Sequence, residues 1–156
     1  MVDRLTGRGG GWVLAQFALM ALIGVVAFLP PAWPEGVQHE LRAVGLVLVV
    51  AGLGLAIAAA TIMGSSLSPF PHPRPDGELV RRGPFAVVRH PMYTGGLLVF
   101  VGIALATGVL ALVGTLALAG LWVGKIRVEE QQLRARYAGY AAYARAVRFR
   151  IIPGIY

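Results

Sequence analysis

Two short polar clusters contain most of the side chains in this sequence that could do chemistry. The first cluster is Arg89-His90-Pro91-Met92-Tyr93, and the second is Glu129-Glu130. A histidine and paired carboxylates can move a proton or hold a cation, and an arginine can hold an anion. The chain has no cysteine, and no two histidines have metal-ligand spacing, so we expect no disulfide, no metal site and no cysteine nucleophile.

Each cluster also has a purely structural interpretation. Pro91 suits the first turn of a helix, and Arg89 beside it could reach the membrane surface with its long side chain. Glu130 and Arg134 form an i,i+4 pair that stabilises a solvated helix by only about 0.2 to 0.5 kcal/mol. A functional interpretation is favoured if the fold brings the two clusters together.

The elements that position these clusters are hydrophobic helices. Hydrophobic residues make up 57% of the 156 residues and charged residues 13%, and the mean hydropathy is +0.71. The uncharged stretches 12–29 and 43–63 are each long enough to cross a hydrocarbon core of about 30 Å. A signal peptide is the alternative for 12–29, but this stretch exceeds the signal core of roughly 7 to 15 residues. The stretch 92–124 is too long for one crossing, so we expect a hairpin of 92–106 and 109–124 that breaks near Ala106-Thr107-Gly108.

The distribution of basic residues predicts the orientation of four spans. Of the 14 lysines and arginines, only Arg42 falls between the first two spans, and four crossings put the other 13 on one side. The positive-inside rule then makes both termini cytoplasmic. A basic face beside an anionic leaflet also explains the net charge of +7, so we expect no nucleic-acid partner. The hairpin places the two polar clusters side by side at its cytoplasmic end.

Three further segments shape the expected fold. Small residues recur every four positions at Gly52, Ala56, Ala60 and Gly64, and again at Gly120 and Gly124, which predicts close helix packing, with a homodimer face as the alternative. Residues 65–77 carry four alternate prolines and predict an extended segment, which we call the proline strap. Residues 125–156 form the cytoplasmic tail, whose helix is expected to bend near Gly139 and to fold over the bundle. The predicted architecture is therefore an all-α integral membrane bundle of four transmembrane helices with a cytoplasmic C-terminal helix, in one domain over 1–156.

The two clusters and the hairpin between them resemble a known family. The run from Gly83 to Gly95, the hydrophobic hairpin and then Glu129-Glu130 are similar to the RHPxY, hydrophobic stretch and EE pattern of the isoprenylcysteine carboxyl methyltransferases. The resemblance extends over about Met63 to Pro153. The RHPxY element alone is shared with membrane phospholipid methyltransferases and sterol reductases.

This resemblance implies a site for S-adenosylmethionine (SAM) between the ends of the last two spans and the tail. The family's cofactor contacts correspond to His90, Tyr93, Glu129 and Glu130 of this chain. Further candidates for cofactor binding are Arg89, which suits the carboxylate of the cofactor, together with Gly95 of the motif and Tyr137 of the tail helix. The expected location is the cytoplasmic membrane of a bacterium.

The expected reaction is methyl transfer to a lipophilic acceptor dissolved in the membrane. Where the family has an arginine four positions before the first glutamate, this chain has Lys125, with Arg127 nearby. We expect Lys125, Arg127 and Glu129 to act on the acceptor, with the two basic residues reaching an anionic group from the membrane edge. The acceptor itself stays open among a prenylated peptide, a phospholipid, a fatty acid and a small thiol. The alternatives are an NADPH-dependent membrane reductase and a non-catalytic membrane module.

Overall fold

The structure is a computed structural model that describes residues 9–30 and 32–156. Within these ranges the chain is helical and has no strand, in agreement with the predicted all-α class. The helices are α2 (Gly10–Val26), α3 (Glu35–Met63), α4 (Pro91–Thr107), α5 (Val109–Arg136) and α6 (Tyr140–Ala146), with two short 3-10 helices, η1 (Gly64–Ser66) and η2 (Gly83–Ala86). Arg4 and Arg8, which contribute to the predicted orientation, lie outside the described residues.

The helices begin and end at residues whose backbone preferences explain the boundaries. Gly64 ends α3 with φ at +52°, and Gly108 separates α4 from α5 with φ at +155°, conformations that glycine adopts at little cost. Pro91 starts α4, because its missing N–H would have no partner in a first helical turn. The predicted hairpin therefore turns at Gly108, and the predicted bend at Gly139 separates α5 from α6.

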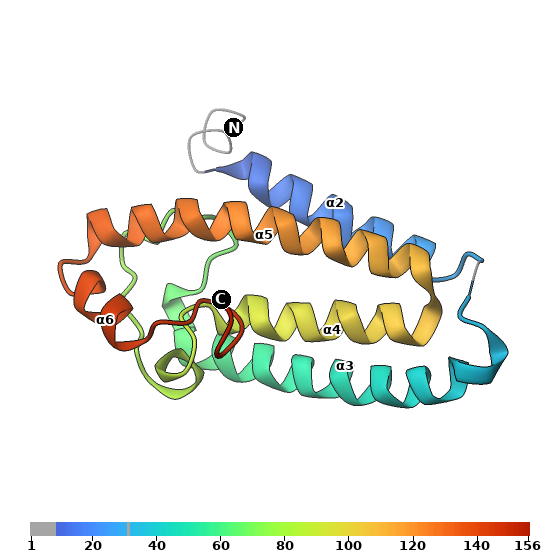
Figure 1. The fold of residues 1–156 in the computed structure, drawn as a ribbon. Coiled ribbons are helices and arrows are strands. Elements are labelled where there is room, and N and C mark those ends of the chain that lie inside the picture. Colours follow the sequence, from blue (N-terminus) through green and yellow to red (C-terminus); the bar gives the residue numbers. More distant parts are fainter. Residues whose placement is uncertain (1–8, 31) are drawn as a thin grey trace.

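The four long helices run side by side (Figure 1). α2 packs along α5, α3 packs along α4, and α4 and α5 are the two arms of the hairpin. The buried core comes from α2, α4 and α5 and consists of Ile23, Phe100, Ala104, Ala111, Leu118 and Trp122. Many large apolar side chains also face outward, among them Leu14, Leu22, Val25, Leu46, Val47, Val50, Ile57, Val113 and Leu116. An outer surface of this kind suits lipid rather than water.

Two of the described helical segments are long and apolar enough to cross a membrane, Glu35–Ser66 and Val109–Arg136. α2 and α4 are apolar but shorter, with 17 residues each, or roughly 25 Å of helix. The observed bounds also differ from the predicted spans, because α3 begins well before residue 43 and α5 continues past residue 124. The second and fourth apolar stretches are thus embedded in longer helices than hydropathy alone predicts.

Paired glycines let α3 and α4 approach closely. Gly45 faces Gly102, and Gly52 faces Gly95, so a Cβ atom on Gly52 would lie 2.5 Å from the carbonyl oxygen of Gly95. In each helix the two glycines are seven residues apart, which is close to two turns and keeps them on one face.

The predicted four-residue stripe of small residues is only partly used. Gly52 and Ala56 do lie against α4. Gly64 instead ends its helix, and a Cβ on Gly120 would meet no atom within 4 Å. In α5, a Cβ on Gly124 would lie 2.9 Å from the Trp12 ring of α2. Close packing is therefore confirmed for Gly52, Ala56 and Gly124, while the facing glycines of α3 and α4 recur every seven residues rather than every four.

We expect Gly52→Ala to destabilise the bundle. The added methyl meets backbone atoms of α4 that cannot move separately from their helix, and overpacking of this kind typically costs about 1 to 3 kcal/mol. Gly54→Ala is the matched control, because a Cβ there meets no atom within 4 Å. Thermal unfolding in detergent should show a lower Tm for Gly52→Ala alone; equal Tm values for the two variants would contradict the glycine contact.

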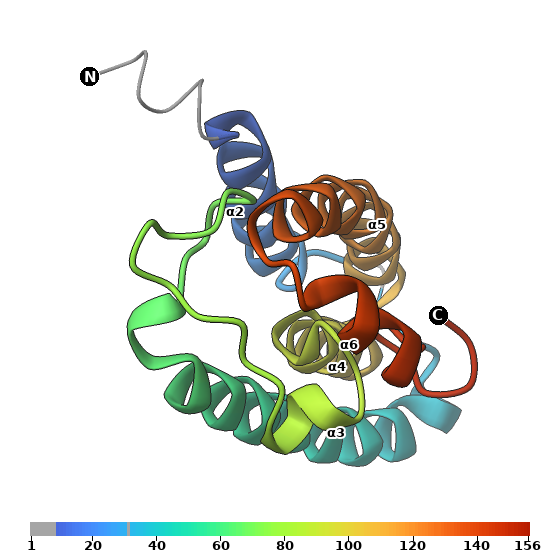
Figure 2. The same ribbon diagram turned by 90° about the vertical axis from the view of Figure 1, so that its left-hand side faces the viewer.

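One end of the bundle gathers the segments that lie outside the long helices. The proline strap, α6 and the residues after α6 all lie where α3 ends, α4 begins and α5 leaves the bundle (Figure 1). Viewed toward this end, α6 lies over the ends of α4 and α5, and the strap runs from α3 toward α2 (Figure 2). Both polar clusters belong to this end.

Candidate functional site

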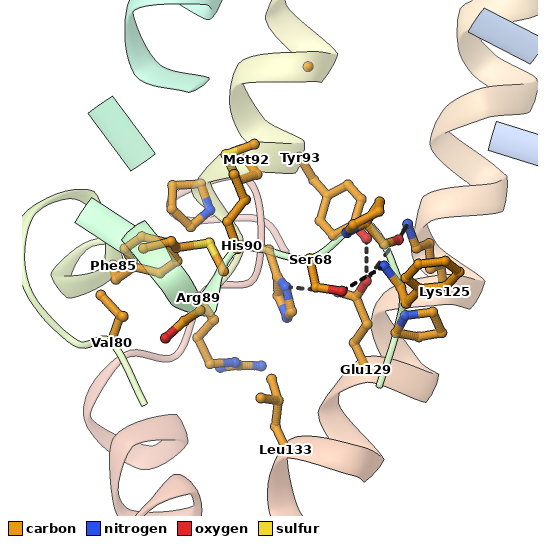
Figure 3. A pocket seen from close by; sticks show the side chains of 18 of the residues that line it. Ser68, Val80, Phe85, Arg89, His90, Met92, Tyr93, Lys125, Glu129 and Leu133 are labelled. Carbon is orange, nitrogen blue, oxygen red and sulfur yellow. Dashed lines mark hydrogen bonds and ion pairs between the residues drawn. The ribbon is translucent and has the colours of Figure 1, made fainter. Parts of the chain in front are cut away.

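A cavity of about 590 Å³ lies beneath the strap, and its size is typical of small-molecule sites. The part between the helices, which we call the apolar arm, is lined by Phe17, Met20, Leu53, Ala56, Gly96, Val99, Phe100 and Trp122. The part under the strap and tail, which we call the mouth, is lined by Leu79, Val80, Phe85, Leu133, Tyr137, Tyr140 and Tyr143. Ser68, Tyr93, Lys125 and Glu129 also line the cavity, and Figure 3 shows them near one another on one side of it.

The first glutamate of the pair meets the first cluster in this cavity. The Tyr93 hydroxyl donates a 2.5 Å hydrogen bond to Oε1 of Glu129, and Nδ1 of His90 lies 3.6 Å from Oε2 (Figure 3). His90 directly precedes α4, and Tyr93 stands in its first turn, so the start of this helix directs both side chains toward α5. The predicted meeting of the two clusters is therefore present in the fold.

The second glutamate takes part in a buried ion network instead. Glu130 accepts a 2.8 Å hydrogen bond from Nε of Arg89 and a 3.0 Å hydrogen bond from Nη2 of Arg150. Nε2 of His90 lies 3.4 Å from the same carboxylate. Glu130 is 4% exposed and does not line the cavity, so its direct neighbours are protein groups.

Arg89 fastens the tail to the bundle. Its Nη1 donates to the carbonyl oxygens of Val147 at 2.7 Å and Arg148 at 2.8 Å, just after α6. The backbone N–H of Arg89 donates to Phe149 at 2.9 Å, in the same segment. Two of the three guanidinium nitrogens are thus bonded to protein, although the side chain also borders the cavity.

Lys125 is buried rather than placed at the membrane edge. Its side chain is 2% exposed, and Nζ donates to Oε1 of Gln16 at 2.8 Å and to the carbonyl oxygen of Pro69 at 2.9 Å. Nζ also lies 3.9 Å from Oε1 of Glu129. The expectation that Lys125 reaches outward to a headgroup is wrong, because its side chain turns inward between α2 and the strap.

Arg127 and Gly95 stand away from the cavity. Arg127 is exposed on α5 and does not line the cavity, because two positions along a helix rotate a side chain by about 200° from Lys125. Gly95 packs against Gly52 of α3, and its neighbour Gly96 lines the cavity in its place. Arg127, which was predicted to be catalytic, and Gly95, which was predicted to contact the cofactor, are therefore not cavity-lining residues.

Three tyrosines of the tail border the mouth. Tyr137 donates to the Gly77 carbonyl at 2.8 Å and so ties the strap to α5, and Tyr143 donates to the Phe85 carbonyl at 2.7 Å. Burial raises the pKa of Tyr143 to about 12 and also raises the pKa of Tyr140, so both phenols are protonated near neutral pH. The buried Tyr140 hydroxyl has no hydrogen-bond partner among the described residues.

Sequence reasoning missed Gln16, Trp122 and the strap carbonyl of Pro69. Gln16 accepts hydrogen bonds from Lys125 and from Nε1 of Trp122, the latter at 3.0 Å. A usable signal existed, since Gln16 is the one amide side chain within 12–29, and polar groups inside apolar spans often serve a function. The carbonyl of Pro69 had no comparable signal. No group of histidine, aspartate and glutamate residues that could hold a metal ion occurs in the described part of the chain.

Known proteins are similar to this chain in part of its sequence or in its fold. The family model for phospholipid methyltransferases matches residues 41–139. The chain is 32% identical over 102 residues to the cobalt-zinc-cadmium resistance protein CzcN of Cupriavidus metallidurans, covering 64% of this chain and 46% of that protein. It is similar in structure to the eukaryotic intramembrane Ras methyltransferase ICMT (isoprenylcysteine carboxyl methyltransferase), with a TM-score of 0.67 and 23% identity over 94% of this chain and 53% of ICMT.

The chain thus spans about half the length of each of these two proteins. The family match covers both polar clusters and the hairpin between them, and the ICMT likeness extends over nearly the whole described bundle. With its predicted likeness to isoprenylcysteine carboxyl methyltransferase confirmed in the fold, the chain belongs to the phospholipid methyltransferase family.

Proposed function

We propose that this membrane methyltransferase takes its methyl group from SAM at the mouth and transfers it to a lipophilic acceptor in the apolar arm. The observation that carries this proposal is the position of Glu129. Its carboxylate lines the cavity where the apolar arm meets the tyrosine-lined mouth, hydrogen-bonded to Tyr93 and close to His90 and Lys125.

The residues of the mouth fit this cofactor. SAM supplies an electrophilic methyl group on a positively charged sulfonium, and a carboxylate together with aromatic rings favours positive charge. Glu129 provides the carboxylate, and Tyr93, Phe85 and Tyr137 provide rings on the cavity wall.

In this proposal, Tyr93 and His90 hold the Glu129 side chain in one rotamer. Their contacts occupy one side of each carboxylate oxygen and leave further lone pairs for a ligand. Arg89 and Glu130 do not contact the ligand in this proposal. Their hydrogen bonds fix the tail against α4 and α5, and the tail then closes the mouth. Methyl transfer is a direct displacement at the methyl carbon. The protein contributes to it mainly by holding donor and acceptor in line and by excluding water.

The apolar arm fits the acyl or prenyl chain of an acceptor that arrives from the bilayer. Phe17 of α2 and Leu53 of α3 both line the cavity and are 52% and 47% exposed. Because α2 packs along α5 and α3 packs along α4, these two helices do not pack along one another in the described residues, and we place the lateral entry of the acceptor between them. The aromatic and aliphatic lining at this entry favours lipid chains over polar solutes.

Lys125 is the group we assign to the acceptor head. It lies where the apolar arm meets Glu129, so an anionic head group there would pair with the ammonium. An acceptor carboxylate needs no base, whereas a thiol, amine or hydroxyl would lose a proton to His90 or Glu129.

The same proposal includes four membrane crossings by α2, α3, α4 and α5. The shorter α2 and α4 lie among longer helices whose outer faces are apolar, so a small local thinning of the bilayer would accommodate them. Thirteen of the 14 basic residues then lie on the same side of the membrane as both termini, which favours cytoplasmic termini and cytoplasmic entry of the cofactor.

Titration of the detergent-purified protein with SAM and, separately, with NADPH tests the cofactor assignment. We expect saturable SAM binding by calorimetry and none for NADPH, because the mouth presents a carboxylate to the ligand. Binding of NADPH alone would support the reductase alternative, and binding of neither would support a non-catalytic module.

A further inference from the structure

One hydrogen-bonded cluster links α2 to the cavity. Oε1 of Gln16 accepts from Nζ of Lys125 at 2.8 Å and from Nε1 of Trp122 at 3.0 Å. Both partners can only donate, so the atom between them must be the amide oxygen rather than the amide nitrogen. The two bonds therefore fix the orientation of the Gln16 side chain.

The ammonium of Lys125 donates two hydrogen bonds although it carries three N–H groups. It has three N–H donors, of which one points to Gln16 and one to the Pro69 carbonyl. The nearest carboxylate oxygen, on Glu129, lies 3.9 Å away, which is beyond hydrogen-bond distance. The third N–H has no hydrogen-bond acceptor among the described residues. Lys125 lines the cavity, and its Nζ lies over the Tyr93 ring, 5.5 Å from the ring centroid.

A lysine needs such partners to hold a head group in one place. Its ammonium is a point charge on a flexible four-carbon stem, whereas an arginine carries a rigid planar fork. Two neutral oxygens, from α2 and from the strap, restrict the ammonium by direct hydrogen bonds, and the carboxylate of Glu129 forms a longer ion pair with it at 3.9 Å. Gln16 also stands next to Phe17 and one turn from Met20, which form the α2 wall of the apolar arm.

We propose that Gln16 is a positioning residue for the acceptor: it aims the free N–H of Lys125 at the acceptor head group and aligns that head with the chain lying along α2. This inference rests on the proposed function, because it assumes that Lys125 meets the acceptor. It predicts that removal of the Gln16 amide oxygen lowers the preference for an anionic head group over a neutral one. The affinity of the apolar arm for the lipid chain should stay unchanged.

A binding experiment without the cofactor separates this role from packing. Trp122 borders the arm, so with Trp12→Phe and Trp33→Phe as the parent background its fluorescence reports a quencher held there. The two probes are 9,10-dibromostearate and its methyl ester, which share a chain and differ in head charge. At about pH 8 the acid is ionised. In the parent we expect the acid to bind at least about 10-fold more tightly than the ester, since charge-assisted hydrogen bonds are strong.

Three variants define the outcome. Gln16→Met keeps the length of the side chain but removes the oxygen, and should reduce the acid-to-ester ratio to about 2- or 3-fold with the ester affinity unchanged. Gln16→Glu keeps the oxygen but neutralises Lys125, and should abolish the ratio while leaving the Tm equal or higher. Thr115→Val is the control, because Thr115 is a buried polar residue of α5 that bonds to Phe100 and lies outside the cavity lining. It should lower the Tm and leave the ratio intact.

Each result decides the inference. If Gln16→Met and the parent show the same ratio of acid affinity to ester affinity, Gln16 is only a packing contact. If the parent does not prefer the acid to the ester, Lys125 does not bind the head group. Either result overturns the proposal. Because no cofactor is present in these titrations, failure here is distinguishable from failure of the proposed function, which would appear as absent SAM binding in the same parent protein.

Discussion

Arg89→Met is expected to lower the free energy of unfolding by about 3 to 5 kcal/mol, the largest stability loss among the substitutions considered. Arg89 and Glu130 form an ion pair at 2.8 Å in which both side chains are only 5% exposed. Methionine keeps the apolar stem but removes this pair and the bonds to the Val147 and Arg148 carbonyls. The buried carboxylate of Glu130 then keeps its pairs with Arg150 and His90 but loses its most buried cationic partner.

Arg150→Met is the matched control for this loss. Arg150 pairs with the same carboxylate at 3.0 Å, but its side chain is 33% exposed, so water already screens the pair and the loss should stay near 1 kcal/mol. Chemical unfolding in detergent measures both values, and limited trypsin digestion at Arg145 and Arg148 reports release of the tail. Equal stability of Arg89→Met and Arg150→Met would contradict the view that Arg89 anchors the tail.

Glu129→Gln is expected to weaken SAM binding about 10- to 150-fold. The substitution keeps the shape and the acceptor for the Tyr93 hydroxyl but removes the negative charge facing the mouth. Loss of one charge-assisted contact typically costs about 1.5 to 3 kcal/mol, which corresponds to this range of affinities. Calorimetric titration with SAM measures the change.

Glu40→Gln controls for the altered net charge. Glu40 is exposed on the first turns of α3, far along that helix from the end that meets the cavity. The affinity of the Glu40→Gln variant for SAM should stay within about 2-fold of the parent value. Unchanged affinity in Glu129→Gln, with the protein folded, would exclude this carboxylate from the cofactor site.

Hydropathy and the positions of prolines and glycines predicted much of the fold, because each of them determines the backbone conformation of its own segment. An uncharged stretch of sufficient length forms a helix in an apolar environment, since its backbone groups must bond within the segment. Pro91 and Gly108 then determine where α4 begins and ends. The hairpin follows from these boundaries, and it brings His90 and Tyr93 to the level of Glu129.

The direction of individual side chains could not be predicted in the same way. Neighbouring residues on a helix point about 100° apart, and here Glu129 lines the cavity while Glu130 faces Arg89 and the tail. The sequence pattern does not say which glutamate faces the ligand and which one faces the tail. The packing of α5 against α2, α4 and the tail decides it, and these contacts come from residues far away in the sequence.

The inward position of Lys125 has a similar cause. A lysine near the end of an apolar helix ordinarily extends toward the membrane surface. Here the strap brings the Pro69 carbonyl, and α2 brings the Gln16 amide, to the inner face of α5, and these two oxygens compensate the buried ammonium. Neither contact is visible from the residues around Lys125 itself.

Transfer of a labelled methyl group from SAM to a lipid-soluble acceptor is the direct test of the proposed activity. The purified protein would be reconstituted in vesicles of mixed phospholipids and fatty acids and incubated with SAM labelled in its methyl group. We expect label to enter a product extracted into organic solvent, at a rate that falls in the Glu129→Gln variant under subsaturating SAM. Label that stays entirely in the aqueous phase with every acceptor class supplied, a prenylated peptide and a long-chain thiol included, would contradict the proposed activity.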